Sequence, residues 1–494
     1  MKLLKSDSFF DGEKYVKNPV EITIRDGLIT ELSYRHTKRA ASWHARFVTP
    51  AFIDSHIHLA GYAKSAMTAN LTGIRTVEEL RKRLLEAPRV SGWILGRGWE
   101  SAHLNFVPHK KILDFILPDT PCSLRSRCGH SLWVNTAALT KAAVTGRTVP
   151  PEGGVIEQDE DGSPTGILKE NGIMLIERAA PSLSESSAFS NALKTALNHL
   201  TGYGIGALCV IAEPKDVALI RDAASCIPLR ILVEERPSKL LSSEGVGSVD
   251  GVKLYKDGAL GNSGALMRLP YLGTKNFGVE ILDNATLEKE LLKSFGRLKI
   301  FAVHAIGDLA VEMVVGLLSC YAKQACQEGT ILRVEHFQTA TLSAIRRAGR
   351  YGIIASVQPV QQYGDVEAAR KRLGKRSRLM YRLRSMLDSG VSLAFGTDAP
   401  VESPHPWRNI QAAMDIGREG VYGDESITLS ESLKCYTSSA ASASAFKQLG
   451  RIKEGYSATL ALYDEDPFEY LCSRNGIESL RPSTLLVDGA PLTG

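Results

Sequence analysis

The sequence lacks the features that would direct a chain to a membrane or to nucleic acid. The N-terminal stretch MKLLKSDSFFDGEK has no apolar run long enough for a signal peptide, and no later stretch is expected to span a bilayer. The net charge is only +5 over 494 residues, with a pI near 8.6. Spread over so large a surface, this charge does not favour nucleic acid or an anionic membrane. We expect a cytoplasmic protein without either partner.

The eight cysteines do not form a metal or disulfide pattern. Cys122 with Cys128, and Cys320 with Cys326, are close pairs, but neither has zinc-finger spacing. Buried free thiols in a reducing cytoplasm are the simpler interpretation.

One basic run, 370–378, invites a nucleic-acid interpretation. It lacks interleaved aromatic residues on a sheet, so we interpret it as a solvated face with at most one substrate-facing arginine.

The two ends of the chain are rich in short strands. Asp26-Gly27 separates two alternating runs, which predicts a β-hairpin. The stretches 455–463 and 483–489 have the same character. We therefore expect residues 1–48 and 450–494 to form one small β-sandwich domain.

Between these ends, short β-branched runs alternate with longer helical stretches, as in a (β/α)8 TIM barrel. We assign residues 49–449 to this barrel, with polar residues at the C-terminal ends of most strands. A segment of about 76–184 does not fit the repeat and is predicted to be an insertion over the barrel mouth. The predicted strands are Phe47–Asp54, Ala207–Ile211, Arg230–Glu234, Val252–Tyr255, Ile300–Val303, Leu332–Glu335, Ile353–Val357 and Ser392–Gly396.

Histidines and an aspartate stand at these strand ends. His56 and His58 are two residues apart, so on a strand both imidazoles point to one face and can share a divalent cation. His304, His336 and Asp398 end the predicted fifth, sixth and eighth strands. Each residue alone has an ordinary structural explanation, such as a helix N-cap for Asp398. Together, at one end of a barrel, they predict a metal site.

Lys253 is the candidate for a bridging anion between two metals. It shares a strand face with Asp257, whereas Lys256 points the other way. A lysine whose pKa is lowered by burial beside cations can add carbon dioxide, and the carbamate then bridges as a carboxylate would. The alternative is an ion pair between Lys253 and Asp257.

Several motifs, in order along nearly the whole chain, resemble the amidohydrolase superfamily. The resemblance is to the amidohydrolase-3 branch, which is similar to N-substituted formamide deformylases. The motifs are Thr-Pro-Ala-Phe-Ile-Asp-Ser-His-Ile-His, Gly-Arg-Gly-Trp-Glu, Gly-His-Ser-Leu-Trp-Val-Asn, Pro-Thr-Gly-Ile-Leu-Lys-Glu, Val-Lys-Leu-Tyr-Lys-Asp-Gly-Ala-Leu-Gly, Val-His-Ala-Ile-Gly-Asp, Arg-Val-Glu-His-Phe-Gln and Phe-Gly-Thr-Asp-Ala-Pro-Val.

The resemblance implies a barrel with a β-sandwich built from both termini. It implies metal ligands at His56, His58, His304, His336 and Asp398, with Lys253 as a carboxylated bridge. His130 matches a position near the substrate. Two departures stand out: Thr397 replaces the usual serine before Asp398, and the segment from Ala458 lacks the usual Ala-Asp pair of the sandwich.

These residues lead to a hypothesis of carbon–nitrogen bond hydrolysis, most simply of an amide or formamide, by a metal-activated hydroxide. Asp398 would carry the proton to the leaving amine, and His130 would either bond the oxyanion or be structural. Trp99 and Asn262 are candidate substrate contacts, although a packed tryptophan is the commoner outcome. Glu335 is predicted to face away from the ligands.

Zinc is the expected ion, one or two per chain, and Fe2+ or Mn2+ would accept the same ligands. The expected partner is a small-molecule substrate, and a homodimer is left open. The same site could serve a deaminase or an esterase. A non-catalytic binding or scaffold protein is the alternative from another class, and it predicts lost ligands.

Overall fold

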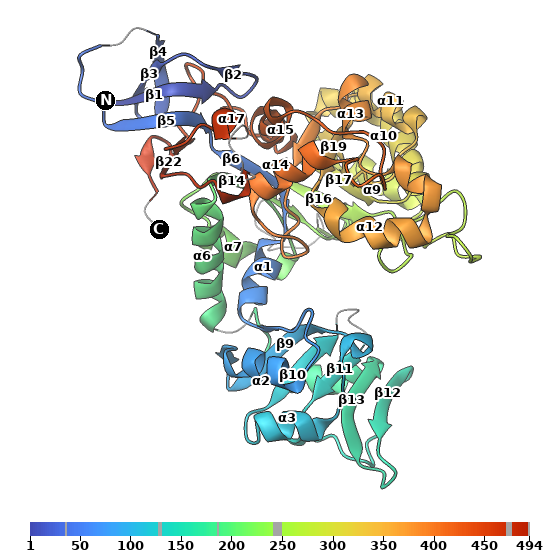
Figure 1. Cartoon of the computed structure of the whole chain (residues 1–494). Coiled ribbons are helices and arrows are strands. Elements are labelled where there is room, and N and C mark those ends of the chain that lie inside the picture. Colours follow the sequence, from blue (N-terminus) through green and yellow to red (C-terminus); the bar gives the residue numbers. More distant parts are fainter. Residues whose placement is uncertain (35–36, 127–130, 185–186, 241–248, 471–476, 493–494) are drawn as a thin grey trace. The chain divides into compact units, whose positions relative to one another are not determined.

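The computed structural model describes residues 1–34, 37–126, 131–184, 187–240, 249–470 and 477–492. These residues form two compact units (Figure 1). The first comprises Met1–Leu59 and Leu197–Gly494, and the second comprises Ala60–Ala196. The first unit contains a barrel and a terminal β-domain, and the second has a sheet of its own.

The barrel is a parallel eight-stranded sheet, and it confirms the predicted fold class. One expectation was wrong in detail: residues 47–50 end the preceding strand, β5 (Trp43–Pro50), and the barrel begins only after Ala51. The barrel strands, in order around the sheet, are β6 (Phe52–Ile57), β14 (Ile205–Ala212), β15 (Leu229–Val233), β16 (Gly251–Tyr255), β17 (Ile300–Ala305), β18 (Ile331–His336), β19 (Ile354–Val357) and β20 (Leu393–Phe395).

The barrel closes between β6 and the segment after β20. The backbone N–H of Asp398 donates to the His56 carbonyl at 2.7 Å, and the N–H of His58 donates to the Ala399 carbonyl at 3.0 Å. The Ser55 hydroxyl donates to the Phe395 carbonyl at 2.7 Å. Closure therefore places the first and last strand ends side by side.

Helices follow the barrel strands, and side chains fix where several of them begin. Asp283 caps α9 (Asn284–Ser294) and Thr341 caps α11 (Leu342–Arg350), each by accepting a backbone N–H of the first turn. The other helices after β14 are α7 (Val217–Ala223), α8 (Pro237–Leu240), α10 (Asp308–Glu328), α12 (Gln361–Arg372), α13 (Leu383–Asp388), α14 (Pro406–Asp415), α15 (Leu429–Tyr436), α16 (Ser438–Ala443) and α17 (Pro467–Tyr470).

Among the described residues, α10 is the one helix long and apolar enough to cross a membrane by length and composition. This differs from the expectation that no stretch would pass such a test. α10 lies between β17 and β18 along the chain, and its buried face includes Val311, Val314 and Leu318. A helix that packs against a barrel needs such an apolar face, so the composition has a structural explanation.

Both termini contribute to one sheet, in the order β23-β22-β21-β5-β1-β3-β4. The predicted hairpin is confirmed between β3 (Val20–Arg25) and β4 (Leu28–Ser33), with positive φ at Asp26 and Gly27 as a tight hairpin turn needs. In Figure 1 the dark blue N-terminal strands lie beside the red β22. The other strands are β1 (Lys2–Phe10), β2 (Tyr15–Val16), β21 (Leu460–Tyr463), β22 (Thr484–Val487) and β23 (Ala490–Pro491).

Backbone hydrogen bonds also join the β3–β4 turn to the segment before β21, whereas the predicted sandwich stays a prediction. The N–H of Ile29 donates to the Tyr456 carbonyl at 2.8 Å, and the N–H of Ala458 donates to the Gly27 carbonyl at 2.8 Å. Ile22 and Leu486, from distant strands of the sheet, share one buried core. Ala458, where the usual Ala-Asp pair is missing, is fully buried in that core.

The second unit is built around a seven-stranded sheet, and the predicted insertion of about 76–184 falls within it. Its location over the barrel mouth stays a prediction. Its elements are α1 (Leu59–Ala66), β7 (Ala69–Asn70), α2 (Val77–Leu85), β8 (Arg89–Val90), β9 (Trp93–Trp99), α3 (Lys110–Ile116), β10 (Cys122–Ser126), β11 (Ser131–Val134), α4 (Thr136–Lys141), β12 (Gly154–Gln158), β13 (Pro164–Glu170), α5 (Met174–Glu177) and α6 (Ser187–Gly202), the first and last of which continue into the first unit.

Candidate metal centre

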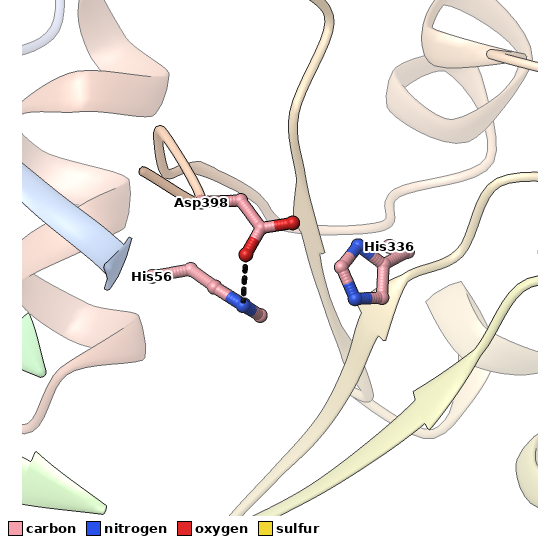
Figure 2. Close-up of side chains that lie close together, drawn as sticks. All are labelled: His56, His336 and Asp398. Carbon is pink, nitrogen blue, oxygen red and sulfur yellow. Dashed lines mark ion pairs between the residues drawn. The ribbon is translucent and has the colours of Figure 1, made fainter. Parts of the chain in front are cut away.

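His56, His58 and Asp398 converge where the barrel closes. Asp398 Oδ1 lies 3.3 Å from His56 Nε2 and 3.4 Å from His58 Nε2. Candidate ligand atoms of His56, His336 and Asp398 all lie within 4.8 Å of one another. Figure 2 shows the Asp398 carboxylate pointing to the His56 ring, with the His336 ring beside them. One carboxylate oxygen thus faces the nitrogens of two imidazoles, as a shared ion requires.

Lys253 reaches the same cluster from β16. Its side chain is buried, with Nζ 3.4 Å from His56 Nε2 and 4.8 Å from the Tyr255 ring centre. Burial lowers the pKa of Lys253, although Asp398 opposes the shift. A lowered pKa increases the fraction of neutral amine, which is the form that attacks carbon dioxide.

Asp257 accepts backbone hydrogen bonds and does not form the alternative ion pair with Lys253. Its carboxylate accepts the backbone N–H groups of Leu266 at 2.9 Å, Ile306 at 3.0 Å and Gly307 at 2.8 Å. Asp257 therefore anchors loops, and Lys253 is left facing the candidate ligands.

His336 and His304 complete the cluster from β18 and β17, with ring centres 4.6 Å apart. His336 Nδ1 lies 2.8 Å from Gln358 Oε1, which favours a proton on Nδ1 and a lone pair on Nε2. Burial lowers the pKa of His336 to about 3, against the opposing charge of Asp398. The ring is therefore neutral at physiological pH, which is the form that binds metals.

His304 supplies the clearest sign that something else belongs in this cluster. It is 8% exposed, and neither ring nitrogen has a hydrogen-bond partner among the described residues, although Nε2 lies 3.5 Å from Asp257 Oδ1. Burial holds its pKa well below the ordinary value, so this ring is also neutral. Buried polar groups without partners are costly, and a metal ion would satisfy one of these nitrogens. The whole donor set, four imidazoles, one carboxylate and one amine, fits a divalent ion that accepts nitrogen and oxygen.

The backbone is strained at two candidate ligands. His336 has φ +69° and Asp398 has φ +56°, in the left-handed region that costs most residues energy. At His336 this breaks the strand alternation, so that Glu335 and His336 both reach the cluster. The prediction that Glu335 faces away was therefore wrong: its Oε2 lies 2.5 Å from His56 Nδ1.

Asp54 ties the two closing strand ends together beneath the cluster. It accepts the backbone N–H of His56 at 3.1 Å and that of Thr397 at 3.0 Å, and also the Thr397 hydroxyl at 2.6 Å. Burial raises the pKa of Asp54 to about 6, although these hydrogen bonds oppose it. Threonine at 397 thus supplies the hydroxyl that a serine would supply.

The structure describes two of the three remaining predicted site residues, Trp99 and Asn262. His130 lies outside the described residues. Trp99 is buried in the core of the second unit, where its indole N–H donates to the Leu124 carbonyl at 2.8 Å, so it matches the alternative of a packed tryptophan. Asn262 is exposed in the loop after β16, and its side chain accepts the Gly264 N–H at 3.0 Å.

Two nearby residues, Glu234 and Gln361, were not anticipated as parts of the site. Glu234, directly after β15, lies 3.9 Å from His58 Nδ1 and accepts the Tyr255 hydroxyl. Gln361 donates to Asp398 Oδ2 at 3.0 Å. Glu234 carried a usable signal, since it is a polar residue at the C-terminal end of a barrel strand.

The fold and this cluster define a (β/α)8 barrel with a candidate metal centre at the C-terminal ends of its strands. Residues 45–490 match the Amidohydrolase family. The chain is 31% identical over 450 residues to Bacillus subtilis YtcJ, covering 85% of this chain and 84% of that protein. This chain therefore belongs to the amidohydrolase family.

Two further comparisons agree. An Arthrobacter pascens protein named N-substituted formamide deformylase is 25% identical over 480 residues, which is 90% of this chain and 87% of that one. A crystal structure of an uncharacterized metal-dependent hydrolase from Pyrococcus horikoshii OT3 superposes with a TM-score of 0.76 at 23% identity, covering 94% of this chain and 98% of that one. The second comparison supports the fold.

Proposed function

We propose that this amidohydrolase cleaves the carbon–nitrogen bond of a small amide or N-substituted formamide, with zinc held by His56, His58, His304, His336 and Asp398. The observation that carries the proposal is the contact of Asp398 with His56 and His58, beside His336. His304, which packs against His336, adds ring nitrogens that no described residue hydrogen-bonds. The formamide deformylase among the relatives supports the substrate class.

When bound, the ion supplies an activated water at neutral pH and polarises the substrate carbonyl. Asp398 is placed to move the proton. Burial alone would raise its pKa, but the charge of His56 and hydrogen bonds hold the pKa well below its ordinary value. The carboxylate is thus free of a proton at neutral pH, accepts one from the attacking water and passes it to the departing amine nitrogen. Gln361 fixes its outer oxygen.

Lys253, as its carbamate, would supply a further carboxylate ligand beside His56, with which the centre could hold two ions. Its burial, its lowered pKa and its 3.4 Å approach to His56 support this. His130 remains the proposed donor to the oxyanion.

The test is a screen of zinc-loaded protein against N-substituted formamides and N-acyl compounds, with amine and acid products identified by mass spectrometry. We expect equal amounts of the two products, and Asp398→Asn should lower kcat by at least about 10²-fold, as loss of acid–base catalysis does. Release of ammonia from a cyclic amidine, or alcohol from an ester, with no amide cleaved would favour the deaminase or esterase alternative instead.

A further inference from the structure

The feature that the proposed chemistry does not use is a buried charged group beneath His56. Glu335, on β18, places Oε2 at 2.5 Å from His56 Nδ1, and both side chains are fully buried. A carboxylate at Nδ1 keeps the proton on that nitrogen and leaves the lone pair on Nε2. Nε2 is the atom that faces Asp398 at 3.3 Å and Lys253 at 3.4 Å.

Arg333 holds the Glu335 carboxylate in place. Its Nε donates to Oε1 at 2.8 Å and its Nη2 donates to Oε2 at 3.0 Å, which makes a two-point contact. The guanidinium also donates to the Ser55 carbonyl at 2.8 Å, to the Ser356 hydroxyl at 3.1 Å and to the Ala443 carbonyl at 3.2 Å. Through Arg333, the position of the carboxylate is fixed relative to β6, β19 and α16. The guanidinium also neutralises the charge of the carboxylate inside the barrel.

Both oxygens of Glu335 are occupied by Arg333 and His56, so this carboxylate is not itself available as a ligand. The other candidate histidines have weaker support on their second nitrogen. His336 has a neutral amide partner, Gln358, and His58 Nδ1 lies 3.9 Å from Glu234, beyond hydrogen-bond reach. His304 Nε2 lies 3.5 Å from the buried Asp257 Oδ1 but makes no hydrogen bond with it. Among the described candidate ligands, His56 is therefore the imidazole that is hydrogen-bonded to a buried charged group.

We propose that Glu335, held by Arg333, is a positioning residue that orients His56 and makes its Nε2 the strongest imidazole donor of the centre. This inference rests on the proposed metal site. It adds that the ion at His56 binds first, because a hydrogen-bonded carboxylate raises the basicity of the ligand and reduces the reorganisation on binding.

The test is zinc affinity, measured by competition with a chelator on metal-stripped protein, with no substrate present. Glu335→Gln keeps the shape and removes the charge, and we expect affinity for the first ion to fall by about 10–100-fold. The matched control is Glu234→Gln, which removes the same charge beside His58; we expect less than about 3-fold, since Glu234 is too distant to orient its histidine. Equal losses in the two variants would overturn the proposal in favour of a general charge effect.

A second variant covers the case in which Glu335→Gln does not fold. Glu335→Asp keeps the charge opposite Arg333 but retracts the carboxylate from His56, so we expect it to fold and still bind zinc more weakly. Wild-type affinity in Glu335→Asp would count against the proposal.

A spectroscopic readout separates orientation from a merely structural effect. In zinc-loaded protein labelled with ¹⁵N-histidine, we expect a strongly downfield Nδ1–H proton that disappears in Glu335→Gln and in His56→Ala. Its absence from the wild-type spectrum would overturn the proposal whichever variants fold. Because neither measurement involves catalysis, failure of the amide screen leaves both results interpretable.

Discussion

Two buried histidines of the first unit are similar in burial and hydrogen bonding but differ in their surroundings. His304, at the end of β17, and His405, just before α14, are 8% and 7% exposed, and no described residue hydrogen-bonds to the ring nitrogens of either. His304 lies against His336, within the cluster of candidate ligands. His405 stacks on the Tyr203 ring, with centres 4.5 Å apart.

The difference shows what an unpartnered buried imidazole can and cannot indicate. Burial without a partner marks a costly group in both places. Only at His304 do other neutral donors and a carboxylate converge, so that an ion would relieve the cost. Convergence of candidate ligands, and not an imidazole nitrogen without a partner, is therefore the observation that supports the proposed metal centre.

The largest expected effect comes from replacing the two histidines in turn. His304→Leu should lower kcat/KM by about 10³-fold, because several kcal/mol of metal stabilisation are weakened, and it should lower the bound metal. The metal-free fold should persist, since no partner of the ring is left unsatisfied. His405→Leu should stay within about 3-fold of wild type in activity. Full metal content in His304→Leu, measured by elemental analysis, would show that His304 is no more a metal ligand than His405 is.

Replacing Glu335, which supports His56, should destabilise the metal-free fold, whereas His304→Leu should not. Glu335→Gln leaves Arg333 buried with a broken ion pair, so we expect the metal-free protein to lose about 3–5 kcal/mol of unfolding free energy in urea. The control is Glu280→Gln, whose partner Lys256 keeps contacts to Leu282 and Asn284, and it should cost no more than about 1 kcal/mol. Similar losses of unfolding free energy in both variants would mean that Glu335 does not stabilise the protein more than an ordinary ion pair does.

Lys253 tests whether the cluster around His304 holds a carbamate. Wild-type protein stripped of metal should regain more activity with zinc when bicarbonate is added, because carbon dioxide supplies the bridge. Lys253→Ala should bind zinc about 10²-fold more weakly and show no response to bicarbonate. A wild-type recovery that does not depend on bicarbonate would argue for an uncarboxylated lysine, which mass spectrometry of the intact protein can check.

The smallest effect concerns the pH dependence of stability at His405. Burial, with the charge of Arg481, lowers its pKa to about 4 from the ordinary 6.5. Between these values the unfolded chain binds a proton and the folded one does not, so stability is lost as pH falls from 6.5 towards 4. His405→Phe should reduce the loss of Tm between pH 7 and pH 5. An unchanged slope would mean that His405 titrates normally.

Much of the site could be predicted from strand ends alone. In a parallel barrel all C-terminal ends meet at one face, so polar residues after separate β-branched runs must come together. His56, His304, His336 and Asp398 followed from that rule, and Asp26-Gly27 predicted its hairpin because the turn needs positive φ.

Other features depended on departures from regular geometry. Glu335 was placed on the wrong side because strict alternation assumes ordinary strand angles, and the positive φ at His336 breaks it. Trp99 belongs to a motif of the resemblance, yet its position in a hydrophobic core follows from the packing of the second unit.

The sequence by itself determined the barrel, the pairing of both termini in one sheet and the types of the candidate ligands, because periodicity and strand-end chemistry are local properties. Only the tertiary structure decided which atoms meet: that Asp257 binds backbone instead of Lys253, and that Glu335 supports His56. The physical reason is that register between strands and the closure of β6 on the segment after β20 are set by the whole barrel. No local pattern encodes a contact across 279 residues.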